Sequence, residues 1–196
     1  MRLPASAHTS RPWRIHEIAP DFRVEDVWEL PTPGGPGDFP RLVEGFASSD
    51  PSSSSSAIVR ALFAIRWKLG QVLGWDRPDS GPSAKRVPTL RERLPDDLQD
   101  SASSTEFKAL PFTPLFLLAD EFAAETANRT MHGILHLGWV PDASGGHRGQ
   151  MAVLVKPNGA FGTAYMAAIK PFRYLLVYPQ MLRQMERRWR QPGHGS

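Results

Sequence analysis

The feature that most constrains this fold is a pair of long β-like stretches separated by a glycine-rich loop. Residues 129–140, RTMHGILHLGWV, and residues 149–156 both have the composition and patterning of strands. The loop between them reads PDASGGHR, and its Pro-Asp and Gly-Gly pairs are typical of a hairpin connection. Because strands joined by so short a loop pair antiparallel, this part of the chain predicts an antiparallel hairpin.

Three shorter stretches precede this hairpin and extend the same pattern. Residues 106–110 and 114–119 have strand character but are interrupted by Pro111 and Pro114, which predicts strands at a sheet edge or with a bulge. Residues 121–128 alternate in side-chain type with a period of two. From about residue 105 onward, the chain therefore predicts an antiparallel meander.

Before the meander, the patterns predict one strand and two short helices. Residues 13–19, WRIHEIA, alternate weakly and predict a first strand. Asp38 is placed to cap a short helix, and its inward-facing residues are expected to be Leu42, Val43 and Phe46. Residues 57–73 predict a second helix that ends at Gly74. Its apolar residues alternate between spacings of four and three: Ile58, Leu62, Ile65, Leu69 and Val72.

The last element is a long helix that the sequence predicts to be kinked. From Phe161 to Trp189, apolar residues follow an alternating spacing of four and three that breaks at Glu186. Pro171 and Pro179 each remove a backbone N–H and clash with the preceding turn, which argues against a straight coiled-coil helix. We therefore expect a kinked helix that lies across the sheet.

Proline and glycine mark the boundaries between these elements. The 196 residues include 19 Pro and 16 Gly, which is above average usage, and many of them gather in loops at 31–37 and 76–88. Residues 1–12 and 191–196 are expected to be flexible tails. Between them, residues 13–190 are long enough for a single domain of ordinary size.

Charge and composition exclude several classes of protein. The formal net charge is +3, and the arginines of residues 183–190 carry this excess, which suits a helix C-terminus better than a nucleic-acid surface. Cysteine is absent, which excludes disulfides, thiolate metal sites and a cysteine nucleophile. Residues 1–13 lack the apolar core of a secretory signal, and no apolar run approaches the roughly 20 residues of a membrane span. A cytoplasmic protein without a nucleic-acid partner is the expectation.

Three segments carry a resemblance to a known family. They are PDFRVEDVWELPTPGG at residues 20–35, NRTMHGILHLGWVP at 128–141 and AYMAAIKPFRYLLVYPQMLRQMERRW at 164–189. They resemble an uncharacterised bacterial domain family whose members occur alone or joined behind an NAD(P)-binding short-chain dehydrogenase-like domain. The element order is similar to the helix-grip fold of the START and birch-pollen-allergen (SRPBCC) superfamily, in which a curved antiparallel sheet wraps around a long C-terminal helix. The expected fold class is therefore α+β.

This resemblance implies a hydrophobic cavity between the sheet and the C-terminal helix. Relatives in the superfamily bind lipids, sterols or polyketides, and some cyclise or dehydrate aromatic polyketides. The residues expected to contact a ligand are Leu135, Leu137, Trp139, Tyr165, Met166, Ile169, Phe172 and Arg173. The alternative is that the same apolar stripe is ordinary core. The chain has no GxGxxG motif, so no dinucleotide-binding unit and no cofactor are expected.

His132 and His136 are the most distinctive polar pair in the expected strands. Four residues of extended chain separate them by about 13 Å, too far to share one ion, so no metal site is expected. Glu121 and Glu125 lie on the preceding expected strand, where a cross-strand Glu–His pair can form and supply acid–base chemistry. The catalytic candidates are therefore His132, His136 and Glu125. The alternative is a solvated outer sheet face that carries both residue types.

Three functional interpretations are compatible with these patterns. The first is binding of an apolar or aromatic small molecule beneath the C-terminal helix. The second is an enzyme of the polyketide cyclase or dehydratase type, in which the histidines and Glu125 act as acid–base groups and Tyr165 or Arg173 orients a carbonyl. The third is an interaction domain that forms a homodimer through the terminal helix or an exposed sheet edge.

Overall fold

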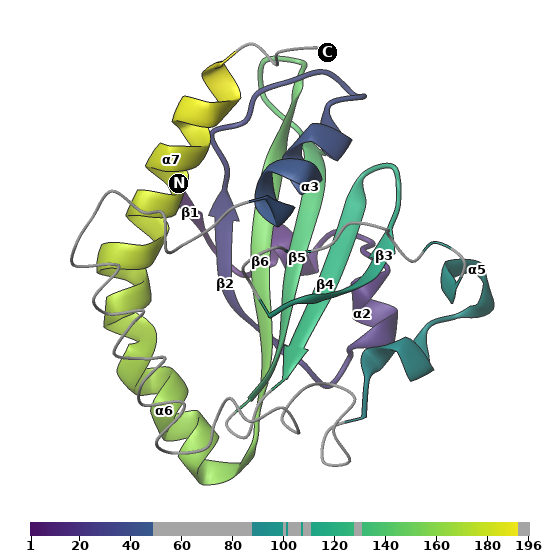
Figure 1. Ribbon diagram of the computed structural model, residues 1–196, viewed down its shortest axis with the longest axis vertical. Helices are drawn as coiled ribbons and strands as arrows, with labels where there is room; N and C mark the ends of the chain where they lie inside the picture. Colours follow the sequence, from purple (N-terminus) through teal and green to yellow (C-terminus); the bar gives the residue numbers. More distant parts are fainter. Residues whose placement is uncertain (49–87, 100, 102–106, 108–110, 128–130, 192–196) are drawn as a thin grey trace.

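The computed structural model has an α+β fold in which one antiparallel sheet carries helices on both faces (Figure 1). It describes residues 1–48, 88–99, 101, 107, 111–127 and 131–191, apart from the side chains of residues 160, 161, 164, 165, 168, 172 and 176. The expected helix 57–73 lies outside the described residues, as do nearly all of the expected strand 106–110 and of the loop 76–88.

Within the described residues, six strands form one sheet in the order β1-β2-β6-β5-β4-β3, and every neighbouring pair is antiparallel. Their bounds are β1 Arg2–Leu3, β2 Arg23–Glu29, β3 Thr113–Leu117, β4 Glu121–Ala127, β5 Met131–Pro141 and β6 His147–Pro157. The run from β3 to β6 confirms the predicted meander. Strands β1 and β2 pair on the other side of β6 and were not predicted as strands.

The turn of the β5–β6 hairpin occupies residues 142–146 and confirms the prediction from its composition. The Asp142 carboxylate accepts hydrogen bonds from the backbone N–H groups of Ser144, at 2.8 Å, and Gly146, at 3.1 Å. Gly145 has a φ of 85°, a conformation that glycine adopts without steric cost. A short polar side chain and a glycine thus close the turn.

Strand β3 lies at the edge of the sheet, as its prolines predict. Pro114 pairs with Ala124 of β4, and the register shifts between Pro114 and Phe116. Proline has no backbone N–H to donate to a neighbouring strand, so an edge position with an irregularity accommodates it. The prediction of an edge-like or bulged strand is confirmed.

Residues 13–19 do not form the predicted strand, and that prediction is wrong. A short helix, α2 (Ile15–Ile18), occupies them instead. Ile15 and Ile18, three residues apart, both point into the core and are at most 2% exposed. The carboxylate of Glu121 accepts hydrogen bonds from the N–H groups of Arg14 and Ile15, so a distant residue satisfies the start of this helix.

Residues 1–12, for which a flexible tail is expected, contain a strand and a short helix. Strand β1 pairs with β2, and helix α1 (Ser6–Thr9) follows it. His8 of α1 is fully buried. Strand β2 lacks a clean alternation because its register shifts between Val24 and Asp26, which explains why its pattern does not predict a strand.

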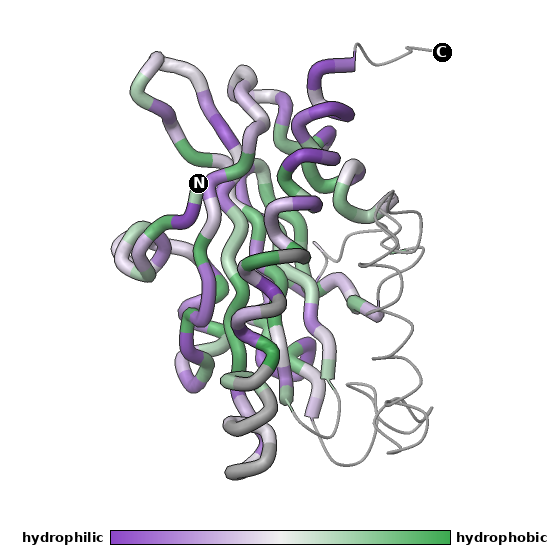
Figure 2. The backbone as a smooth tube through the Cα atoms, turned by 90° about the vertical axis from the view of Figure 1, so that its left-hand side faces the viewer, coloured by the Kyte–Doolittle hydropathy of each residue, from purple (hydrophilic) through white to green (hydrophobic). Residues whose placement is uncertain are grey.

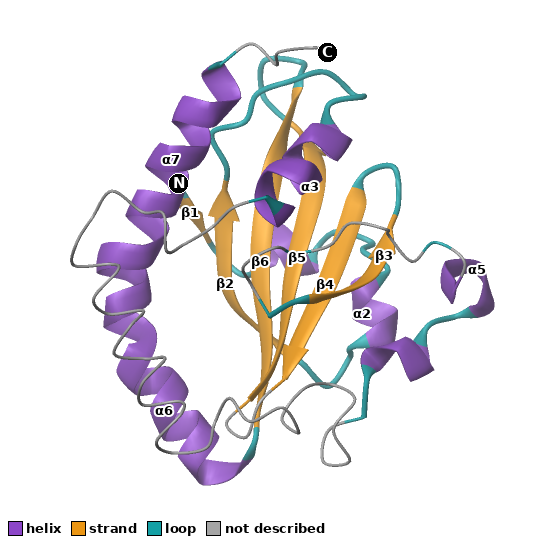
Figure 3. Ribbon diagram, viewed as in Figure 1, coloured by secondary structure: helices purple, strands orange, loops and turns teal. Residues whose placement is uncertain are grey.

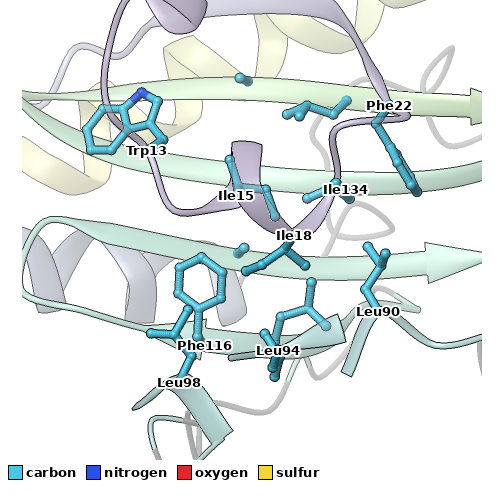
Figure 4. Close-up of a cluster of buried hydrophobic side chains, with 14 of the residues drawn as sticks. Trp13, Ile15, Ile18, Phe22, Leu90, Leu94, Leu98, Phe116 and Ile134 are labelled. Carbon is cyan, nitrogen blue, oxygen red and sulfur yellow. The ribbon is translucent and has the colours of Figure 1, made fainter. Parts of the chain in front are cut away.

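One face of the sheet packs against short helices near the N-terminus and before β3 (Figure 4). These helices are α1, α2, the 3₁₀ helix η3 (Leu90–Arg93) and α5 (Asp96–Gln99). The labelled side chains of this first core are Trp13, Ile15, Ile18, Phe22, Leu90, Leu94, Leu98, Phe116 and Ile134. We call this the N-terminal face of the sheet.

The opposite face packs against α3 (Phe39–Ala47) and the C-terminal helix, and we call it the helix face. The predicted helix at Asp38 is confirmed, and its inward residues are buried as expected: Leu42, Val43 and Phe46. The Asp38 carboxylate accepts a hydrogen bond from the Gly35 N–H at 2.8 Å rather than capping the first turn. Figure 1 shows α3 in front of the sheet and α2 behind it.

The C-terminal helix is long and bent, as the prolines predict (Figure 3). Helix α6 (Gly159–Phe172) passes into a π-helical segment, η4 (Arg173–Val177), and then into α7 (Tyr178–Arg190). Pro171 lacks the N–H that continues regular hydrogen bonding, and Pro179 sits in the first turn of α7. The expected fold class is confirmed, and the arrangement resembles the helix-grip fold.

Three arginines lie in the last turn of α7, at the helix C-terminus where they are expected: Arg187, Arg188 and Arg190. Figure 2 shows this end of the helix as strongly hydrophilic. Arg190 pairs with Glu186 at 2.6 Å one turn earlier. Cations in the last turn of a helix interact favourably with its C-terminal carbonyl groups. Within the described part of the chain, no helix is both long and apolar enough to cross a membrane.

A glycine on the N-terminal face permits the close approach of Trp13 to β5. A Cβ atom added at Gly138 would lie 2.7 Å from Cζ2 and 2.8 Å from Cη2 of the Trp13 ring. We expect Gly138→Ala to lower the free energy of unfolding by about 1–3 kcal/mol because the buried ring must move. Urea denaturation measures this loss, with Gly37→Ala as the control, because Gly37 is an exposed turn residue and nothing lies within 4 Å of a Cβ there. An unchanged stability of Gly138→Ala would contradict the packing.

Candidate functional site

In the described part of the chain, a cluster of polar side chains is buried against each face of the sheet. The His–Glu cluster lies on the N-terminal face and consists of His8, Glu121, Glu125, His132 and His136. The Asp26 cluster lies on the helix face and consists of Glu25, Asp26, Arg173, Tyr174 and Tyr178. Buried polar groups cost stability unless they are hydrogen-bonded, so both clusters call for a physical account.

Two cross-strand pairs form the centre of the His–Glu cluster. His132 Nε2 lies 2.8 Å from Glu125 Oε2, and His136 Nε2 lies 3.0 Å from Glu121 Oε1. Each pair joins β5 to a diagonal neighbour on β4, because Ala127 is directly opposite His132 and Ala123 directly opposite His136. The Glu–His pairing that the strand spacing suggests is therefore present.

Each glutamate also accepts hydrogen bonds from a helical turn on the N-terminal face. Glu121 binds the N–H groups of Arg14 and Ile15, both at 2.9 Å. Glu125 binds the Leu90 N–H at 3.0 Å and the Thr89 hydroxyl, at the start of η3. The two carboxylates thus hold α2 and η3 against the sheet.

His8 extends the Glu121–His136 pair into a chain of three groups. His8 Nε2 lies 3.1 Å from His136 Nδ1. When His136 donates a hydrogen bond from Nε2 to Glu121, its Nδ1 carries no proton and accepts a hydrogen bond from the Nε2–H of His8. The Nδ1 of His8 then carries no proton and can only accept a hydrogen bond. That Nδ1 atom is buried and has no hydrogen-bond partner among the described residues.

The two linked histidines are held neutral. Burial, together with the nearby His136 and His16, lowers the pKa of His8 to about 2. Burial also lowers the pKa of His136 and outweighs the opposing effect of its hydrogen bond to Glu121. For Glu125, burial raises the pKa, but the hydrogen bonds from His132, Thr89 and the Leu90 N–H leave it below its usual value.

The structure places these catalytic candidates in the protein interior. His132 is 4% exposed and His136 and Glu125 are fully buried, so the interpretation as a solvated outer face is wrong. The physical reason is that α1, α2 and η3 cover this face, and no local pattern predicted that cover. Among the described residues, no group of three His, Asp or Glu side chains is arranged to hold a metal ion. The catalytic role of the three candidates stays a prediction.

The ligand-contact candidates on β5 point to the opposite face. Leu135, Leu137 and Trp139 belong to the core that packs against α3 and the C-terminal helix. The Trp139 ring lies 6.1 Å from those of Phe39 and Trp189, and its Nε1 donates to the Gly35 carbonyl. These neighbours pack the Trp139 ring within a core, and its contact with a ligand stays a prediction.

The candidates on the C-terminal helix have different surroundings. Met166 is 3% exposed, Ile169 is half-buried, and Arg173 reaches β2. The side chains of Tyr165 and Phe172 lie outside the described part of the structure. The structure thus places Arg173 in the Asp26 cluster on the helix face, whereas the histidines lie on the N-terminal face of the sheet.

The Asp26 cluster links β2 to the π-helical segment. The Tyr178 hydroxyl donates to Asp26 Oδ2 at 2.8 Å, and the Tyr174 hydroxyl donates to Asp26 Oδ1. Arg173 Nη2 lies 3.3 Å from Asp26 Oδ2 and 3.4 Å from Glu25 Oε1. The Asp26 side chain is fully buried, and the partners that the described residues give it belong to the C-terminal helix.

This environment perturbs both tyrosines, and within the described part of the chain it leaves the Nε–H of Arg173 without an acceptor. Burial and the Asp26 carboxylate raise the pKa of Tyr174 to about 12 and raise the pKa of Tyr178 further. Both hydroxyls therefore stay protonated and act as hydrogen-bond donors. Arg173 Nε is buried and has no acceptor among the described residues.

Sequence reasoning missed Asp26 as a site residue. The only local signal is a pair of adjacent acids, Glu25 and Asp26, between the apolar residues Val24 and Val27. Tyr174 and Tyr178 are four residues apart, the spacing that places two side chains on one helix face. Neither signal indicates that the two segments meet.

Comparison with known protein families gives a match over most of the chain. A family model described as protein of unknown function (DUF2867) matches residues 18–180. The chain belongs to this family. Comparison with curated proteins and comparison with solved structures both give no match. The relation of this DUF2867 domain to the SRPBCC superfamily and to dehydrogenase fusions stays a prediction from the resemblance.

Proposed function

We propose that this DUF2867 domain binds an apolar or aromatic small molecule that carries a carbonyl or carboxylate group, between the sheet and the C-terminal helix. The observation that carries the proposal is Arg173, whose buried Nε–H has no acceptor among the described residues. A buried, unpartnered guanidinium donor is costly, and a ligand oxygen would satisfy it. Asp26 and Glu25 hold the guanidinium in place from the other side.

Two backbone irregularities that meet at Asp26 support a ligand site there. Strand β2 has a register shift between Val24 and Asp26, and the C-terminal helix is π-helical from Arg173 to Val177. Bulges and single π-turns recur next to functional sites because they redirect a side chain at a local cost in regular hydrogen bonding. The Asp26 cluster joins both irregularities through one carboxylate.

The apolar surface beside the cluster supports the class of ligand. Val153 of β6 is directly opposite Asp26 of β2 and Leu135 of β5. Although β6 is an inner strand of the sheet, the Val153 side chain is only half-buried. Trp28 packs near both tyrosines, with its ring 4.8 Å from that of Tyr178. An apolar body beside Val153, with its polar group at Arg173, matches the usual composition of a ligand site.

The geometry favours binding over the cyclase-like alternative. The histidines and Glu125 lie on the N-terminal face, whereas Arg173 lies on the helix face. Acid–base catalysis requires a group within hydrogen-bond reach of the reacting atom, and the sheet separates the two sets. A homodimer, the absence of a nucleic-acid partner and a cytoplasmic location stay predictions.

The proposal is tested with the fluorescent probe anilinonaphthalene sulfonate, which has an aromatic body and an anionic oxygen group. We expect saturable binding to the native protein and an increase of about tenfold or more in Kd for Arg173→Met, because a charge-assisted hydrogen bond is lost. Native mass spectrometry of protein purified from cells then identifies any co-purifying molecule.

Arg183→Met is the matched control, because Arg183 is an exposed arginine on the same helix. Its Kd for the probe should equal that of the unchanged protein. Thermal unfolding of each variant establishes that the fold is intact. Equal affinity of Arg173→Met and Arg183→Met, or binding that does not saturate, would refute the proposal.

A further inference from the structure

A pocket at the N-terminal end of the chain lies apart from the Asp26 cluster. It has a volume of about 470 Å³. Its walls come from β1, α1, the C-terminal end of β2, and the ends of β5 and β6 next to their hairpin turn. Its lining residues are Leu3, Ala7, Ser10, Arg11, Glu29, Val140, Pro141, Arg148, Gly149 and Gln150. Val140 belongs to the core of the N-terminal face, so the sheet separates this pocket from the helix face. We call it the N-terminal pocket.

The buried lining of the pocket contains a polar atom that no described residue pairs with. Gln150 is 4% exposed, and its Nε2 donates to the Ala7 carbonyl at 3.3 Å. Its Oε1 is buried and has no donor among the described residues. Because a buried amide oxygen loses free energy when it is unpaired, the pocket provides a position that a ligand hydroxyl or amino group would satisfy.

The walls of the pocket carry a net positive charge. Arg148 Nη1 pairs with Glu29 Oε1 at 2.7 Å, so these two charges offset each other. Arg11 forms no ion pair with any other described residue, and its guanidinium lies 6.0 Å from the centre of the Trp13 ring. One uncompensated arginine favours a ligand with a single negative charge, and the planar guanidinium matches a carboxylate in particular.

We propose that the N-terminal pocket binds a small monocarboxylate that also carries a hydroxyl or amino group. The carboxylate pairs with Arg11, and the hydroxyl or amino hydrogen is donated to Gln150 Oε1. Leu3 and Val140 provide the apolar contacts. The volume is within the usual range of small-molecule pockets, about 300–1,000 Å³.

The test uses a matched pair of carboxylates, mandelate and phenylacetate, which differ by one hydroxyl group. Their Kd values are measured by chemical-shift titration, which also reports where each binds. We expect mandelate to bind at least about tenfold more tightly than phenylacetate, because only mandelate satisfies Gln150 Oε1. Lactate and serine, which share the same two groups on smaller bodies, extend the titration.

Two variants separate the contributions of the two polar groups. Arg11→Met should weaken all of these carboxylates by about tenfold or more. Gln150→Met should weaken mandelate and leave phenylacetate unchanged. Arg183→Met, far along the C-terminal helix, should change neither affinity.

The proposal is overturned if none of these carboxylates shifts resonances of the pocket at millimolar concentration. It is equally overturned if Arg11→Met binds mandelate as the unchanged protein does, or if the hydroxyl gives no preference. Arg11 lies at the half-buried wall of the pocket, so its variant remains informative even if Gln150→Met fails to fold.

Discussion

Replacing Glu121 with alanine is expected to lower the free energy of unfolding by about 3–5 kcal/mol. The Glu121 carboxylate accepts the backbone N–H groups of Arg14 and Ile15 and the ring nitrogen of His136. Its removal leaves these groups buried and unpaired, and each lost partner costs roughly 1–3 kcal/mol. The N-terminal start of α2 loses its cap at the same time.

Urea denaturation followed by circular dichroism measures this loss. Glu44→Ala is the control, because Glu44 is an exposed residue of α3 and should change stability by less than about 0.5 kcal/mol. Glu121→Gln should fall between the two, since its amide keeps one acceptor oxygen but turns an N–H₂ group toward donors. A loss below about 1 kcal/mol for Glu121→Ala would show that the carboxylate does not hold α2.

Stability is expected to fall steeply as the pH drops below about 6.5. In the unfolded chain His8 takes up a proton near its ordinary pKa of 6.5, whereas in the folded protein its pKa is about 2. The unfolded state therefore binds more protons throughout this window, and stability is lost as the pH falls. Between pH 7 and pH 5, His8 alone should lower the free energy of unfolding by about 2 kcal/mol.

Two other groups act in the same direction. The pKa of His136 is also lowered by burial, so it adds to the loss below pH 6.5. The lowered pKa of Glu125 gives a contribution that is present above its ordinary value of 4.5 and disappears as the pH falls below it. The protein should consequently be more stable at neutral pH than below about pH 6.5.

The measurement is the slope of the unfolding free energy against pH between 7 and 5, compared with His8→Gln. The slope gives the number of protons that the chain takes up on unfolding. Near pH 5 this number should be smaller by about one for His8→Gln than for the unchanged protein, whatever the stability of the variant. The ring resonances of His8 should also stay those of a neutral imidazole over this range. An identical slope in both proteins, or a titration of His8 near pH 6.5 in the folded state, would contradict the prediction.

Much of the fold was predictable because its determinants are local. The alternation in residues 121–140, the turn at Asp142 and the prolines of the C-terminal helix each act through neighbouring residues in the chain. Strand β2 and helix α2 were not predictable in this way. A bulge disrupts the alternation of β2, and the start of α2 depends on Glu121, more than a hundred residues away.

The candidate sites divide along the same line. The strand spacing indicated that His132 and His136 could reach glutamates on the neighbouring strand, and they do. It could not indicate that α1, α2 and η3 bury them, because those elements are distant in sequence. Asp26 was missed because its partners, Tyr174 and Tyr178, are about 150 residues away in the chain.

The sequence by itself determined the hairpin, the helix α3, the edge position of β3 and the bend in the C-terminal helix. Period, turn residues and missing N–H groups act over a few residues, so they can be seen in the chain. Only the tertiary structure decided which polar groups are buried and which of them meet. The pKa of His8 and the lack of a partner, among the described residues, for Arg173 Nε and Gln150 Oε1 depend on what covers each group, and that cover comes from distant segments.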